Sequence, residues 1–66
     1  MNTNTLLETL DTRINHNAAL ARGIERHLNL RRNVTDKDTA NVLRRGLETF
    51  QAVVRELTEI RTELTR

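Results

Sequence analysis

The residues best suited to metal binding or proton transfer are two histidines and a pair of aspartates. Neither His16 nor His27 belongs to a His-x-x-x-His or Glu-x-x-His pair, the spacings that place two ligands on one side of a helix. Asp36 and Asp38 lack the nearby glycine and terminal glutamate of a calcium loop. The sequence has no serine, cysteine or glycine-rich phosphate loop. We therefore predict no catalytic residue, metal site or cofactor, and a protein that is not an enzyme.

Basic residues gather in the middle of the chain. Between positions 22 and 45, seven basic and three acidic residues give a net charge of +4, whereas four basic and six acidic residues elsewhere give −2. Near a turn, such residues form a basic tip that suits an acidic protein surface, a phosphate-bearing molecule or RNA. The residues of this candidate binding site, the basic tip, are Arg26, Arg31, Arg32, Lys37, Arg44 and Arg45. Solvation and helix-dipole compensation explain the same charges without a ligand, so both interpretations stay open.

Two long segments with apolar residues at alternating intervals of three and four must position that tip. This spacing is typical of a heptad seam on one side of an amphipathic helix. The predicted seam residues are Leu7, Leu10, Ile14, Asn17, Ala21, Ile24, Leu28, Leu43, Gly46, Phe50, Val53, Leu57, Ile60 and Leu64. Leu6 and Leu20 widen the first stripe, and Leu47 and Val54 widen the second.

The chain contains no proline, so nothing interrupts either helix. We expect helices at about residues 5–32 and 36–64, joined by a turn at about 33–35. A turn this short forces the two helices to lie antiparallel. The predicted fold class is therefore all-α, an antiparallel helical hairpin that forms a single domain over residues 1–66.

The expected helix starts carry typical capping residues. Thr5 and Glu8 fit a capping box at the first helix. Thr35 fits an N-cap at the second, because Asp36 and Asp38 follow it and carboxylates favour the positive end of the helix dipole.

The widened stripes predict an oligomer. A seam alone serves one neighbouring helix, whereas a seam with flanking apolar residues contacts two. We expect two hairpins to pair, coiled-coil fashion, into an antiparallel four-helix bundle, a homodimer being favoured. Turns at opposite ends would set each basic tip beside the acidic open end of the other copy. A different protein covering the stripe, in a heterocomplex, is the alternative.

Two residues interrupt the apolar pattern. In a hairpin centred near positions 33 and 34, Ala21 faces Gly46 and Asn17 faces Phe50. The small pair then allows close helix approach, and the seam asparagine sets register at some cost in stability. A contact point for a partner at the glycine, or a ligand in the bundle core at the asparagine, are the alternatives.

Composition indicates the cellular compartment of the protein. The absence of cysteine fits a reducing compartment. The N-terminal residues do not form the basic and apolar regions of a secretory signal, and no apolar run approaches the ~20 residues that span a bilayer. We expect a cytoplasmic protein without a membrane segment.

In size and layout the chain is similar to three types of small helical hairpin. These are the plasmid-encoded RNA-binding hairpin that controls copy number, the co-chaperones of type III secretion needle subunits, and phage proteins that sequester cyclic-nucleotide signals. The segment LRRGLETFQAVVREL, residues 43–57, resembles the second helix of the phage group. No motif is specific to one family, and no binding residue is transferred.

The leading functional hypothesis is a non-catalytic interaction protein, an adaptor, chaperone or phage-type inhibitor, which homo-oligomerises and docks on a protein partner. The first alternative is binding of RNA or a nucleotide-like anion, such as a cyclic nucleotide, through the basic tip. It is disfavoured for nucleic acid because the tip has no aromatic residue to stack on bases. The second alternative is a subunit of a heterocomplex, such as a secretion co-chaperone.

Overall fold

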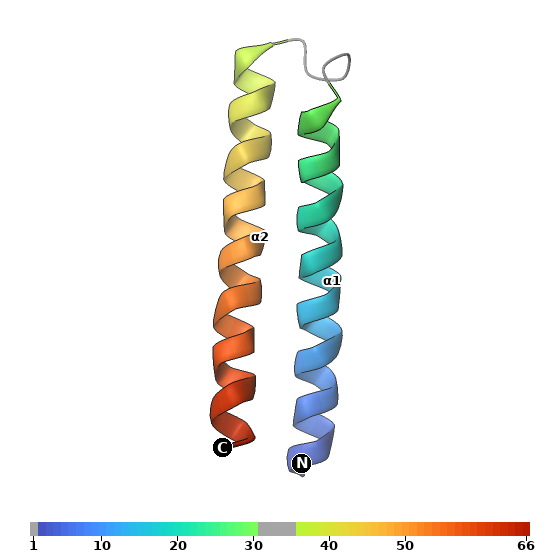
Figure 1. The fold of residues 1–66 in the computed structure, drawn as a ribbon, viewed down its shortest axis with the longest axis vertical. Helices are drawn as coiled ribbons and strands as arrows, with labels where there is room; N and C mark the ends of the chain where they lie inside the picture. Colours follow the sequence, from blue (N-terminus) through green and yellow to red (C-terminus); the bar gives the residue numbers. More distant parts are fainter. Residues whose placement is uncertain (1, 31–35) are drawn as a thin grey trace.

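Two long helices pack side by side in the computed structural model, which describes residues 2–30 and 36–66 (Figure 1). Helix α1 spans Thr3–Asn29 and helix α2 spans Lys37–Leu64. They run antiparallel, with both chain ends at the same end of the hairpin. The prediction of an all-helical, hairpin-like fold is thus confirmed.

The hairpin is a thin rod. It measures 48 × 16 × 13 Å and its radius of gyration is 15.0 Å, compared with about 11 Å for a compact domain of this length. Within residues 2–30 and 36–66, three apolar residues are buried: Leu10, Ala21 and Ala40, each at 7% exposure. A rod of two helices has no interior beyond the line where they touch, so most apolar side chains remain partly exposed.

Helix α1 begins two residues before the predicted start. Asn2 has an extended backbone and is the N-cap, with its Oδ1 accepting a hydrogen bond from the backbone N–H of Thr5 at 2.8 Å. The predicted capping box at Thr5 is therefore wrong, because asparagine already satisfies the free amide there and is at least as good a cap as threonine.

The end of α1 also differs from the prediction. The helix stops at Asn29, because Leu30 leaves the helical region with φ −91° and ψ 95° and its N–H bonds back to the His27 carbonyl. Leu30 therefore does not belong to the helix that we predicted over about residues 5–32. The predicted turn at 33–35 and the two arginines before it, Arg31 and Arg32, lie outside the described residues.

Helix α2 starts at Lys37, with Asp36 as its N-cap. The Asp36 carboxylate accepts from the Thr39 backbone N–H at 2.6 Å and from the Thr39 hydroxyl at 2.8 Å. Asp36 therefore takes the capping role that the sequence suggested for Thr35, a residue outside the described ranges. Asp38 adds a carboxylate in the first turn, where the helix dipole favours negative charge.

This cap predicts acid sensitivity. The Thr39 backbone N–H, followed by its hydroxyl, lowers the pKa of Asp36 because both bonds favour the carboxylate. The stabilisation is therefore present above the unfolded pKa of about 3.9 and is lost as the pH falls through the lower folded value. Asp36→Asn keeps a capping oxygen but has no charge to lose.

Thermal unfolding followed by circular dichroism at about pH 7 and about pH 2.5 checks this prediction. The melting temperature of wild type should decrease more on acidification than the melting temperature of Asp36→Asn. Asp38→Asn is the matched control, since it removes a charge from the same turn and leaves the cap intact. An equal acid effect in wild type and Asp36→Asn would contradict the assignment of Asp36.

Candidate interaction surface

The described members of the basic tip lie on the surface near the connected ends of the helices. Lys37 is the first residue of α2, Arg26 lies in the last turn of α1, and Arg44 and Arg45 follow two turns into α2. All four are exposed. No ion pair is formed by any of them within residues 2–30 and 36–66. Their charges therefore remain available to an anionic surface.

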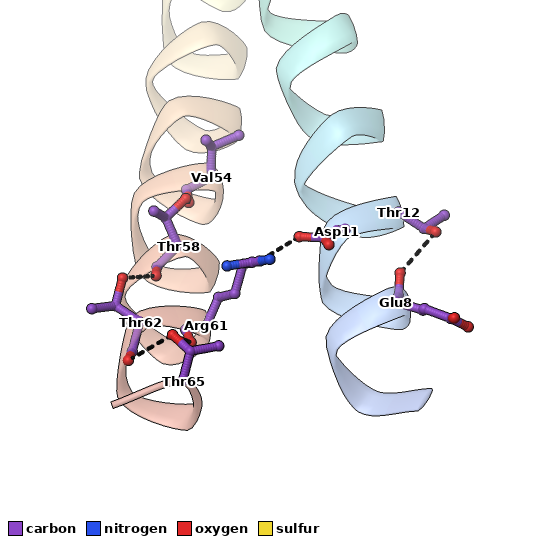
Figure 2. A network of polar contacts seen from close by, with 8 residues as sticks. All are labelled: Glu8, Asp11, Thr12, Val54, Thr58, Arg61, Thr62 and Thr65. Atoms are coloured by element: carbon purple, nitrogen blue, oxygen red, sulfur yellow. Dashed lines mark hydrogen bonds and ion pairs between the residues drawn. The ribbon is translucent and has the colours of Figure 1, made fainter. Parts of the chain in front are cut away.

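The ion pairs of the described chain lie instead near the open end. Figure 2 shows Arg61 of α2 reaching toward Asp11 of α1, where its Nε donates to the carboxylate at 2.6 Å. Both side chains are more than 40% exposed, so this contact contributes at most about 1 kcal/mol. Arg66 pairs with Glu63 at 3.3 Å within the last turn. The Asp11–Arg61 pair shows that Arg61 lies on the side of α2 that faces α1 here.

That side is not the predicted seam at the C-terminal end of α2. Arg61 is partly buried against α1, whereas the neighbouring seam residue Ile60 is 48% exposed and Leu64 is 38% exposed. Heptad positions on a straight helix drift by about 20° per repeat. After three repeats, the row that faces the neighbouring helix has moved to the next position. Ile60 and Leu64 are consequently left uncovered by α1.

Ile60 and Leu64 share one row of α2 with the exposed Val42 and with Gly46 and Val53, which are partly buried, and we call this row the α2 strip. Its members are Val42, Gly46, Val53, Ile60 and Leu64. Helical geometry places all of them within about 40° of one another around the axis. Val42 is the most exposed, at 66%, and it lies outside the predicted stripe. Its position could have been predicted from the sequence, because Val42 lies four residues before Gly46 and therefore one helical turn away on the same side of α2.

Two open grooves show how the sides of the hairpin differ. Leu20, Ile24 and Leu43 line one groove, together with Ala19, Gly23 and His27. The other is lined by Ala18, Ala21, Arg22, Glu25, Gln51 and Val54. One side is thus mainly apolar, and the other mixes small, charged and amide side chains.

The α2 strip lies on the apolar side. Val54 borders the mixed groove, and the strip is turned about 100° away from Val54 around the axis of α2. It must therefore lie across the contact line, on the side where Leu20 is 39% exposed. This side of the hairpin consequently carries exposed apolar residues from both helices. Toward the open end, the same side of α1 carries a polar groove lined by Thr9, Arg13 and His16.

The seam asparagine is satisfied by its own helix. Asn17 is partly buried, and its Nδ2 donates to the Arg13 carbonyl at 2.8 Å. No hydrogen bond joins it to α2 in the described residues. Its role in setting the register of a bundle stays a prediction.

Gly46 has a different neighbour from the one predicted. A Cβ placed on Gly46 would lie 3.4 Å from Cδ1 of Ile24 and within 4 Å of no Ala21 atom. The predicted small pair is therefore wrong, because the helices sit in a register that points Ile24 at the glycine. The second glycine, Gly23, has open space where a Cβ would stand.

Gly23→Ala should stabilise the hairpin. Alanine fits the open space and removes the conformational entropy cost of glycine, so the free energy of unfolding should rise by about 0.5–1 kcal/mol. Urea unfolding at fixed protein concentration measures it. Gly46→Ala is the comparison variant, and its gain should be equal or smaller because of the contact with Ile24. A loss of stability in Gly23→Ala would show that another chain packs on this position.

The histidines remain apart from other candidate ligands. Both His16 and His27 are exposed on α1. No group of three or more histidine, aspartate or glutamate side chains suitable for a metal ion occurs in the described residues. Neither α1 nor α2 contains a segment with the length and hydropathy of a membrane span.

Comparison of the chain with protein-family models, curated proteins and solved structures found no match.

Proposed function

We propose that the protein is a non-catalytic helical-hairpin interaction protein that pairs with a second copy to form a four-helix bundle. The observation that carries this proposal is the apolar side described above. Leu20, Val42 and Ile60 are each at least 39% exposed there. Exposed apolar residues repeated along one side of a helix are the kind that packing against another chain would cover.

The total surface supports the same conclusion. The single chain exposes 5358 Å², whereas a globular monomer of 7.7 kDa is expected to expose about 4,300 Å². The excess of roughly 1,000 Å² is close to the ~800 Å² that each partner buries in a stable interface. A second hairpin would cover an area of this size.

Sedimentation equilibrium over a concentration series tests the pairing. The proposal expects a species of twice the 7.7 kDa chain mass, dissociating on dilution. A folded monomer at the highest concentration would overturn it. A poorly helical or aggregating chain would overturn it too, in favour of a heterocomplex whose other subunit covers the apolar side.

We further propose that the dimer docks on an acidic protein surface through the basic tip. The exposed positions of Arg26, Lys37 and Arg44, without acidic partners in the described residues, support it. Complementary charge at an exposed rim raises the association rate and selects the partner.

Capture from a native lysate with purified dimer as bait tests the docking. The bait should retain a protein in stoichiometric amount, and Arg26→Glu/Arg44→Glu bait should lose it. Arg55→Glu is the control, since Arg55 is equally exposed but lies in the middle of α2. Equal capture by the double variant would contradict the role of the tip. Binding of a labelled RNA that weakens steeply with salt would instead favour the nucleic-acid alternative.

A further inference from the structure

The spacing of the residues in the α2 strip is the same in both chain directions. From Val42 to Leu64, its members are separated by four, seven, seven and four residues, with Val53 at the centre. Reversing the helix therefore places apolar positions over apolar positions. A self-complementary row of this kind is what an interface between two identical chains requires, because each copy presents the same patch.

Resting on the homodimer proposed above, we propose that the second copy packs antiparallel, α2 against α2, with a twofold axis at Val53. Val53 then meets Val53 of the second copy. Gly46, which adjoins Ile24 of its own α1, lies level with Ile60 of the second copy. Val42, the most exposed member at 66%, lies level with Leu64 of the second copy. The connecting segments fall at opposite ends of the bundle.

Charges beside the strip agree with this register. Arg45, Glu59 and Glu63 each immediately precede a strip residue, so they lie on the same flank of it. Antiparallel packing brings this flank against its equivalent in the second copy. Arg45 then lies level with position 61 of the second copy, about 3 Å along the axis from each of its two glutamates. The symmetry repeats the contact at the other end.

The charge of the whole hairpin favours the same orientation. The part of the chain between positions 22 and 45 has a net charge of +4 and the rest −2. With the connecting segments at opposite ends, each basic end lies beside an acidic open end. With both at one end, two basic regions would repel each other.

The packing within the hairpin shows which part of α1 lies near the proposed twofold axis. The contacts Asp11–Arg61 and Ile24–Gly46 set the level of Val53 at about residues 17–19 of α1. Leu20 therefore lies within one helical turn of the axis. Its exposed side chain is placed to contact α1 of the second copy, so both helices contribute to the interface.

Single cysteine variants test the register, because the chain has no cysteine of its own. Under mild oxidation, Val53→Cys should form a disulfide-linked dimer at least about tenfold faster than Gln51→Cys, since the interface raises the effective thiol concentration. Gln51 borders the mixed groove on the other side of the hairpin. An equal mixture of Val42→Cys and Leu64→Cys should form the mixed dimer in preference to either self-linked dimer.

The outcomes separate this inference from the homodimer itself. Circular dichroism first establishes whether each variant is as helical as wild type. If Val53→Cys is less helical, the mixture of Val42→Cys and Leu64→Cys decides the register. The register is overturned, and the homodimer left standing, if the chain is dimeric by sedimentation but Val53→Cys links no faster than Gln51→Cys and the mixture shows no preference. A monomer at every concentration overturns both.

Discussion

Val53→Asp should convert the dimer into a monomer over the concentrations at which wild type is paired. The association constant should fall by at least about 100-fold, equivalent to about 2.7 kcal/mol. At the proposed twofold axis the substitution places two carboxylates against each other, where both lose water and repel. Sedimentation equilibrium of wild type and variant under identical conditions measures the change.

The single hairpin should tolerate this change, because Val53 is only partly buried within it. Gln51→Asp is the matched control, with the same new side chain two residues away on the mixed groove, and it should remain dimeric. A Val53→Asp variant that stays dimeric would remove Val53 from the interface. Dissociation of both variants would point to net charge rather than position.

Leu10→Ala should be the most destabilising single truncation inside the hairpin. Leu10 is the largest of the three buried residues, at 7% exposure, and the cavity left by the truncation should cost about 2–3 kcal/mol. Urea unfolding followed by circular dichroism, at one protein concentration, gives the change. In a rod with so few buried residues, this loss is a large fraction of the total stability.

Asn15→Ala provides the comparison, because Asn15 is exposed on the same helix and its truncation should change stability by less than about 0.5 kcal/mol. If Leu10→Ala unfolds at the same urea concentration as wild type, Leu10 does not lie in the contact between α1 and α2. The description of the core would then be wrong at its largest residue.

The sequence alone was sufficient for the fold. Intervals of three and four from Leu7 to Leu28 and from Leu43 to Leu64, without proline, allow only two long amphipathic helices. The helix ends were less predictable, because several residues near each end can cap. Asn2 and Thr5 both qualify by type, and only the backbone conformation identifies Asn2 as the cap.

The heptad pattern could not show which residues of α2 face α1 along its whole length. The pattern places the apolar residue Ile60 in the seam and leaves the charged Arg61 outside it. The outcome depends on whether the helices supercoil or stay straight, since only a supercoil keeps one row in contact. Arg61 rather than Ile60 meets α1, and this shift leaves Ile60 and Leu64 exposed.

The basic tip differs from the helix packing, because its function depends on a molecule outside the chain. The tip was predicted from a count of charges along the chain. Its described members, Arg26, Lys37, Arg44 and Arg45, are exposed near the connected ends of the helices, and its role in binding stays a prediction. What the tip binds depends on a second molecule, and no pattern within one chain carries that information.

The small core links the amount of this protein to its survival. An isolated hairpin that buries three side chains in its described part has little free energy to oppose unfolding, and pairing would supply the remainder through mass action. Scarce chains would then spend more time open to proteolysis than abundant ones. Steady-state levels should therefore rise more steeply than synthesis, so that a modest change in expression acts as a threshold.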